Sequence, residues 1–165
     1  MRTRNLRGVV YLSGGLGLLV AIFAAAEFYT ASLRSACSIN QFFSCATVDQ
    51  SGRTTTLGVP DYLWGIGGFV VLLVVASLAE RYPHDVRPAY LLTALATGAV
   101  ALSAYFIYVQ LAEIHALCVV CASAETLGGI LWLGSIALAV RTRRGAAGPP
   151  GPGEDDEPQR PTTAT

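Results

Sequence analysis

Hydrophobic positions along this chain gather in four long stretches. They run over residues 8–33, 62–79, 89–112 and 117–140, and few charges interrupt them. A helix needs about 20 apolar residues to cross a bilayer. Because the hydrocarbon core offers no water to an open backbone, segments of this length must be helices that satisfy their own hydrogen bonds. The pattern therefore predicts an all-α, integral membrane four-helix bundle.

Two polar segments complete the chain. Residues 34–61 form a large loop between the first and second predicted helices, and residues 145–165 form a tail rich in proline, glycine and acidic side chains. The composition of the tail does not allow it to bury a core, so we expect it to be disordered. The chain is thus expected to divide into a four-helix domain over residues 1–144 and a cytoplasmic tail over residues 145–165.

The overall composition agrees with a membrane protein. Of the 165 residues, 53% are hydrophobic and only 13% are charged, which is typical of a chain that crosses a membrane several times. The net charge of +0 gives no indication of nucleic-acid binding. A cleaved signal peptide is the alternative for the first stretch, but the apolar run exceeds the roughly 7–15 residues of a signal core. We therefore expect an uncleaved membrane anchor.

The arginine residues predict the orientation in the cell membrane. Most of them flank the chain start, the connection between the second and third stretches, and the end of the fourth. These are Arg2, Arg4, Arg7, Arg81, Arg87, Arg141, Arg143 and Arg144. Only Arg34 and Arg53 lie in the long loop, so the positive-inside rule places both termini in the cytoplasm. The loop then lies at the extracytoplasmic face, where disulfides persist.

Four cysteines lie on that side as two pairs. Cys37 and Cys45 stand in the loop, and Cys118 and Cys121 form a C-x-x-C at the start of the fourth helix. Two structural disulfides are one interpretation, but a C-x-x-C bridge closes too small a loop to restrict the unfolded chain much. A tetrahedral zinc site is another, but the seven residues between the loop cysteines are unlike the short knuckles of zinc ribbons.

A redox interpretation of the cysteines has a physical mechanism. At a helix N-terminus, Cys118 meets free amides and the positive end of the helix dipole, which stabilise a reactive thiolate. Cys121 shares a helix face with it. A second pair in a facing loop can pass electrons inward by thiol–disulfide exchange, and a lipid-soluble quinone is the natural acceptor in a membrane.

The order of these motifs resembles the vitamin K epoxide reductase family. The chain reads "CSINQFFSC", then a serine, then "LGVPDYLWG", then "CVVC" at the last helix, and the resemblance covers roughly residues 8–140. Ser51, six residues after Cys45, and Gly58, seven further on, also fall where that family has them. The four-helix quinone-type disulfide oxidases of bacteria place the C-x-x-C in the first loop instead, so their order is reversed.

The resemblance implies a role for each cysteine. Bacterial members of the family are membrane quinone reductases that drive disulfide formation in secreted proteins. By position, Cys37 exchanges with a thioredoxin-like partner, Cys45 relays to Cys118, and Cys121 lies next to the quinone. The acceptor is menaquinone or ubiquinone, and no nucleotide is needed.

Three further residues occupy family positions. Ser51 matches a loop serine that helps to hold the active-site region, and an ordinary turn serine is the alternative. Asp61 stands where animal members have an asparagine that bonds the quinone oxygen, and a helix N-cap after Pro60 is the alternative. Glu125, one turn beyond Cys121, stands where animal members have a tyrosine.

Glu125 is an ionisable residue inside a predicted membrane helix. Such residues are costly to place in a membrane, so we interpret Glu125 as a functional residue. We expect its protonated form to bind or protonate the quinone, and a polar contact between helices is the alternative. Two other polar residues receive structural interpretations. Glu27 is expected to form a surface ion pair with Arg34, and His115 is expected to face solvent.

The sequence therefore predicts an enzyme, a thiol-disulfide:quinone oxidoreductase that reoxidises an extracytoplasmic thioredoxin-like thiol oxidase. With only four cysteines in the chain, we expect that partner to be a separate protein. Two alternatives stay open. One is electron flow in the opposite direction, which reduces a vitamin K-type quinone or epoxide. The other is a non-catalytic membrane protein whose cysteines form structural disulfides.

Overall fold

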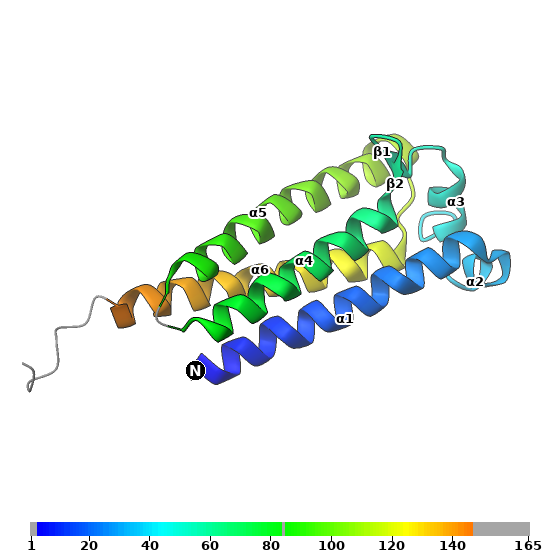
Figure 1. The fold of residues 1–165 in the computed structure, drawn as a ribbon. Coiled ribbons are helices and arrows are strands. Elements are labelled where there is room, and N and C mark those ends of the chain that lie inside the picture. Colours follow the sequence, from blue (N-terminus) through cyan, green and yellow to red (C-terminus); the bar gives the residue numbers. More distant parts are fainter. Residues whose placement is uncertain (1–2, 84, 147–165) are drawn as a thin grey trace, which may run out of the picture.

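Four long helices dominate the computed structural model, which describes residues 3–83 and 85–146 (Figure 1). They are α1 (Thr3–Tyr29), α4 (Asp61–Arg81), α5 (Arg87–Tyr108) and α6 (Val119–Ala146). A π-helical segment, η1 (Val109–Ile114), extends α5 without a break. All four helices, with η1 counted as part of α5, are long and apolar enough to cross a membrane. The predicted all-α, four-helix fold is therefore confirmed for the described residues.

The connection between α1 and α4 is more ordered than an open loop. It contains the short helices α2 (Ala31–Ala36) and α3 (Cys45–Gln50), followed by a hairpin of β1 (Thr55–Thr56) and β2 (Val59–Pro60). Figure 1 shows these elements together at the end of the bundle opposite the N-terminus. Helix α1 ends at Tyr29, before the predicted end at residue 33, because Thr30 adopts an extended backbone (φ −117°, ψ 105°).

The last helix also differs from its predicted bounds. It begins at Val119 because Leu117 pairs with the loop in a β-bridge instead of entering the helix. Its other end reaches Ala146, so the first residues of the expected tail belong to α6. The rest of the tail, residues 147–165, lies outside the described residues.

Apolar packing holds the bundle together along its length. Helix α1 packs against α4 and α6, and α5 packs against the same two helices. The buried core residues from all four helices are Val10, Ala21, Phe69, Leu72, Val75, Ala76, Leu92, Ala96 and Leu131. A Cβ at Gly14 of α1 would lie only 2.8 Å from Leu73 of α4 and 3.1 Å from Leu131 of α6. A glycine at this position therefore lets α1 approach both neighbours.

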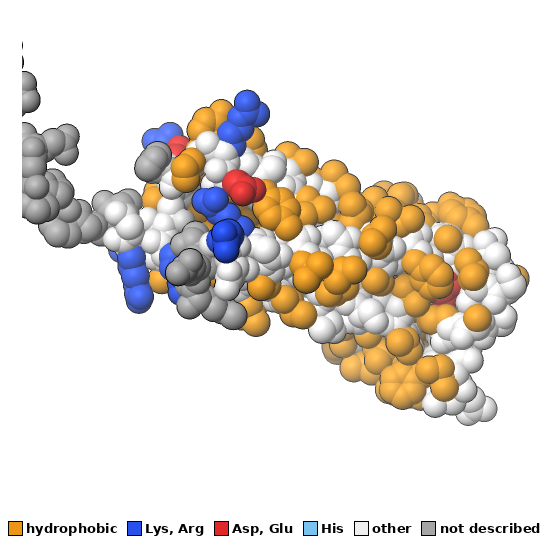
Figure 2. Space-filling view, turned by 90° about the horizontal axis from the view of Figure 1, so that it is seen from below, with side chains coloured by type: hydrophobic (Ala, Val, Ile, Leu, Met, Phe, Trp, Pro, Cys, Tyr) orange, Lys and Arg blue, Asp and Glu red, His pale blue; other side chains and the backbone are white. Residues whose placement is uncertain are grey.

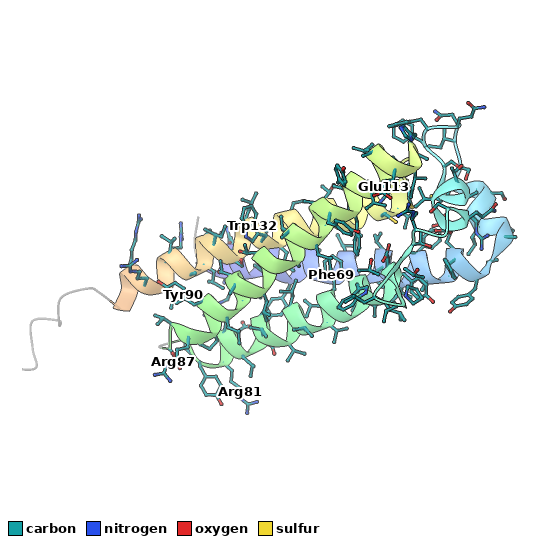
Figure 3. The ribbon with its side chains drawn as sticks, turned by 90° about the horizontal axis from the view of Figure 1, so that it is seen from above. Phe69, Arg81, Arg87, Tyr90, Glu113 and Trp132 are labelled. Atoms are coloured by element: carbon teal, nitrogen blue, oxygen red, sulfur yellow. A yellow bond between two sulfur atoms is a disulfide. The ribbon has the colours of Figure 1, made fainter. Side chains whose placement is uncertain are left out.

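The outer surface of the helices is apolar where a membrane would contact it. Large side chains such as Leu12, Leu19 and Leu133 are 61–66% exposed, and a patch of this extent marks a surface that meets lipid or protein. In Figure 2 the flank is hydrophobic between an arginine-rich end and the loop end. Figure 3 places Arg81 and Arg87 at the end remote from Glu113.

Candidate redox site

Backbone hydrogen bonds attach the cysteine-bearing loop to the segment before α6. The Leu117 N–H donates to the Phe42 carbonyl at 2.7 Å, and the Ser44 N–H donates to the Leu117 carbonyl at 3.2 Å. Cys45 follows Ser44 directly, and Cys118 follows Leu117 directly. The two bonds therefore fix the separation of these cysteines, although they lie 73 residues apart in sequence.

The four sulfur atoms form one continuous chain. Cys37 and Cys45 are joined by a disulfide, whereas Cys118 and Cys121 are free thiols. The Cys118 Sγ lies 3.3 Å from the Cys45 Sγ. Cys45 and Cys118 are fully buried, while Cys37 and Cys121 at the two ends of the chain are partly exposed. A sulfur atom is thus accessible at each end, and the contact between Cys45 and Cys118 is shielded from water.

The backbone around Cys118 is arranged as a helix start. Its carbonyl accepts the Ala122 N–H at 2.9 Å, and its sulfur accepts the Cys121 N–H at 3.3 Å. A side chain that accepts the third amide of a helix occupies the N-cap position. The Cys118 sulfur is therefore held at the N-cap of α6, where it faces the Cys45 sulfur.

Gln110 is a component of the site that sequence reasoning missed. It is 6% exposed and lies on η1, where its side-chain Oε1 accepts the Cys118 N–H at 2.9 Å. Its backbone carbonyl accepts the Ala116 N–H at 3.1 Å. The available signal was a glutamine inside an otherwise apolar stretch, eight residues before the C-x-x-C.

A cavity of about 680 Å³ opens between the four long helices beside Cys121. Its wall is mostly apolar, with contributions from Phe69, Leu72 and Phe106. The polar and charged side chains in the wall are Glu27, Asp49, Arg53, Thr54, Thr56, Asp61, Ser103, Gln110 and Glu125, and Tyr62, Trp64 and Tyr105 also line it. A cavity of this size and lining is typical of a small-molecule site.

Asp61 is one of the sequence-predicted residues in this wall. It is the first residue of α4, and Pro60 occupies the N-cap position. The Asp61 Oδ1 accepts the Thr56 hydroxyl at 2.8 Å. The expectation that Asp61 caps α4 is therefore wrong, because its carboxylate bonds to the hairpin and faces the cavity.

Glu125 lies in the same wall, one turn beyond Cys121. Its Oε2 is buried and has no hydrogen-bond partner among the described residues. A buried polar oxygen without a partner costs about 1–3 kcal/mol, and a ligand donor is one way to recover that cost. The site thus brings Cys118, Cys121, Asp61 and Glu125 to one cavity.

Ser51 is placed differently from these residues. It ends α3, where its hydroxyl donates to the Val48 carbonyl at 2.6 Å and accepts the Arg53 N–H at 3.2 Å, and it is not among the cavity-lining residues. Arg53 in turn pairs with Glu113 of η1 at 2.9 Å. Ser51 therefore shapes the loop backbone and acts on the site only through it.

The expected surface pair of Glu27 and Arg34 is a further error of the sequence reading. Glu27 is 2% exposed, and Arg34 pairs instead with Asp49 of α3 at 3.5 Å. Burial raises the pKa of Asp49, and the guanidinium of Arg34 partly offsets this effect. His115 is exposed, as expected, and has a left-handed backbone (φ 57°) in the turn after η1.

The four long apolar helices and the clustered cysteines at one end of the bundle together define the class, a helical membrane protein with two neighbouring cysteine pairs. The sequence model of the vitamin K epoxide reductase family matches residues 9–136, a range that reaches into all four long helices. The chain belongs to the vitamin K epoxide reductase family, a family of oxidoreductases. A search of the curated proteins found no match.

Proposed function

We propose that the protein is a thiol-disulfide:quinone oxidoreductase that reoxidises a separate, extracytoplasmic thioredoxin-like protein and reduces a membrane quinone. The observation that carries this proposal is the unbroken chain of four sulfurs, with Cys45 and Cys118 in contact at 3.3 Å. Partly exposed Cys37 is the entry for electrons. Cys121, in the cavity wall, is the exit.

Electrons enter when a partner dithiol reduces the Cys37–Cys45 disulfide. The Cys45 thiolate then attacks Cys118 within a Cys118–Cys121 disulfide, and Cys37 closes on Cys45 to release Cys118. The partner gains one disulfide, and two electrons and two protons arrive at the C-x-x-C. The structure, with a loop disulfide and two free thiols, corresponds to the state reached after this transfer.

The cavity residues fit a quinone in that role. An apolar wall suits the ring and isoprenoid chain, and the buried Glu125 Oε2 lacks a partner. We assign Glu125 and Asp61 to hold the quinone oxygens through carboxyl hydrogen bonds. A bound quinone supplies an acceptor for two electrons and two protons.

The same proposal places the cysteines outside the cell membrane. The ends of α4 and α5 that carry Arg81 and Arg87 lie opposite the loop end (Figure 3). The positive-inside rule assigns such an arginine-bearing end to the cytoplasm. Both termini are then cytoplasmic, and the partner meets Cys37 in the oxidising compartment.

Single-cysteine variants in lipid nanodiscs test the electron route. Quinone reduction is measured with a reduced thioredoxin-like protein as donor. In a separate trapping assay with the oxidised form of that protein, the free Cys37 thiol of Cys45→Ala attacks the partner's disulfide; a Cys37–partner disulfide forms as one partner thiol is released. Cys121→Ala instead leaves Cys118 bonded to Cys45. Quinone reduction should be lost in all four variants Cys37→Ala, Cys45→Ala, Cys118→Ala and Cys121→Ala. Normal quinone reduction by all four would overturn the proposed function.

Glu125→Gln tests the quinone end separately. We expect this variant to retain disulfide exchange with the donor protein but to reduce quinone roughly 100-fold more slowly, because the carboxyl group that would deliver a proton to the quinone is lost. Glu113→Gln is the matched control, because this acid pairs with Arg53 at the protein surface. Unchanged quinone kinetics in Glu125→Gln would remove Glu125 from the site.

A further inference from the structure

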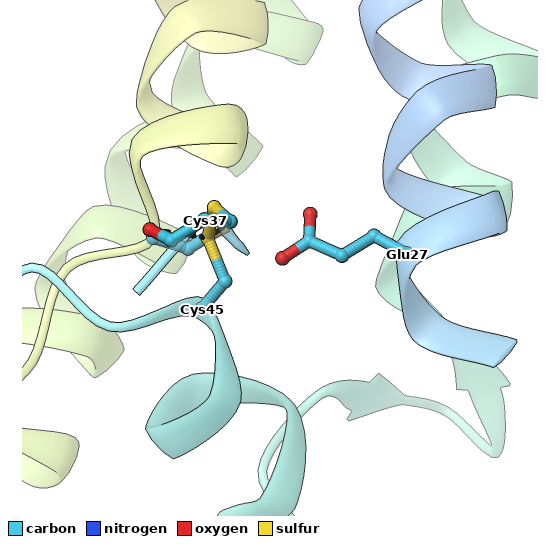
Figure 4. Close-up of side chains that lie close together, drawn as sticks. Glu27, Cys37 and Cys45 are labelled. Carbon is cyan, nitrogen blue, oxygen red and sulfur yellow. Dashed lines mark hydrogen bonds between the residues drawn. A yellow bond between two sulfur atoms is a disulfide. The ribbon is translucent and has the colours of Figure 1, made fainter. Parts of the chain in front are cut away.

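Glu27 is a buried acid that the electron route above does not use. It lies in the last turns of α1 and is 2% exposed, and its Oε1 has no hydrogen-bond partner among the described residues. A carboxylate oxygen of Glu27 and the sulfurs of Cys37, Cys45 and Cys118 all lie within 4.8 Å of one another. Figure 4 shows the carboxylate directed toward the Cys37–Cys45 disulfide.

This placement needs an explanation, because an unpartnered carboxyl group is costly to bury. The nearby charges do not neutralise it by contact, since Arg34 of α2 forms its ion pair with Asp49 of α3. A metal ion would be an alternative partner. Two of the three sulfurs in the cluster are joined in a disulfide, however, so they do not offer thiolate ligands in this state.

We propose that Glu27 is the proton carrier for the exchange between the loop pair and Cys118, an inference that rests on the proposed function. In the step concerned, the Cys37 thiol gives its proton to the Glu27 carboxylate and attacks Cys45 of a Cys45–Cys118 mixed disulfide. The Cys37–Cys45 bond forms, the Cys45–Cys118 bond breaks, and the leaving Cys118 thiolate takes the proton from Glu27. One disulfide replaces another, and the carboxylate is regenerated.

The geometry favours Glu27 over the other acids near the sulfurs. One oxygen atom of Glu27 reaches both the sulfur that loses the proton and the sulfur that gains it. Asp49 of α3 is held by Arg34, and Glu125 of α6, one turn beyond Cys121, does not belong to the cluster that Glu27 forms with the three sulfurs. The buried position also keeps bulk water from replacing Glu27 in this role.

The test measures exchange alone, without quinone. Protein with both pairs oxidised is mixed with one equivalent of dithiothreitol, quenched with acid, and alkylated for mass spectrometry of each cysteine. We expect Glu27→Gln to slow the appearance of the Cys37–Cys45 disulfide with free Cys118 by roughly 100-fold. The Cys45–Cys118 mixed disulfide should accumulate in its place.

The pH dependence separates proton transfer from a structural role. Without the carboxylate, the attacking thiol must ionise by itself, so the Glu27→Gln rate should rise about 10-fold per pH unit up to the thiol range near 8.5. Arg34 and Asp49 face the same site and are unchanged in this comparison. Glu27→Asp, which keeps an acid, should recover part of the rate at neutral pH.

Glu80→Gln is the matched control, since Glu80 pairs with Arg7 rather than contacting the cysteines, and its exchange rate should equal that of the parent protein. Parental exchange kinetics in Glu27→Gln would overturn the proposal, as would a slow rate that does not respond to pH. Neither result would touch the proposed function, which stands or falls on quinone reduction by the cysteine variants.

Discussion

Replacing Gln110 with leucine tests whether this side chain holds Cys118 in place. The substitution removes the Oε1 atom that accepts the Cys118 N–H at 2.9 Å and leaves that donor without a partner in a buried site. A buried, unsatisfied donor costs about 1–3 kcal/mol. Because the bond joins η1 to the start of α6, this cost falls on the closed arrangement of the two segments. The equilibrium constant for separation of η1 from the start of α6 should therefore increase about 5- to 150-fold.

Alkylation of Cys118 reports that opening, because its residue is only 2% exposed in the closed site. In the parent protein, Cys118 and Cys121 are the two free thiols while the loop disulfide is intact. N-ethylmaleimide is added to protein in nanodiscs, and mass spectrometry of the peptides gives the rate at each cysteine. Gln110→Leu should label Cys118 faster by the factor above.

Gln50→Leu serves as the control, because Gln50 is an exposed residue at the end of α3. Its rate of Cys118 labelling should match that of the parent protein. If Gln110→Leu also labels at the parental rate, Gln110 does not restrain Cys118 and the reasoning is refuted.

Two further predictions concern the loop. Gly58 has a backbone φ of +78°, so Gly58→Ala should destabilise the hairpin by about 1–2 kcal/mol. Gly67→Ala is the control and should leave the hairpin unchanged, because Gly67 lies inside α4 with open space around its Cα. Limited proteolysis of the loop compares the two variants. Burial raises the pKa of Asp49, so the folded state binds this proton more tightly than the unfolded state. The resulting stabilisation is present at low pH and is lost as pH rises through the raised pKa. Asp49→Asn should therefore reduce the change of the thermal unfolding temperature with pH in the acidic range. An unchanged pH dependence would contradict the raised pKa of Asp49.

The sequence was sufficient to predict the helices, because runs of apolar residues this long have one solution in a membrane. It also predicted that both cysteine pairs belong to one end of the bundle. It did not reveal that Leu117 leaves the helix to pair with the loop, since a β-bridge joins segments far apart in the chain and has no local pattern. The burial of Glu27 and Gln110 beside the cysteines was not predicted for a similar reason. Whether a residue at a helix end is buried depends on which residues the loop covers.

The loop disulfide and the backbone bonds that dock the loop contribute similar free energies. The redox state of Cys37 and Cys45 should therefore affect how easily the loop moves away from Cys118. Closing a ring across the sequence separation of 8 residues restricts the unfolded loop by roughly 2.5 kcal/mol in the chain-entropy account.

The two backbone bonds that join Phe42 and Ser44 to Leu117 contribute about 1 kcal/mol each. Reduction of Cys37–Cys45 therefore removes a restraint about as large as the docking itself. Cys45 lies against Cys118 while the loop disulfide is formed, and we expect the reduced loop to move more freely around this contact. This freedom would allow Cys45 to separate from Cys37 after the partner has attacked, exchange with Cys118, and then close the bond with Cys37 again.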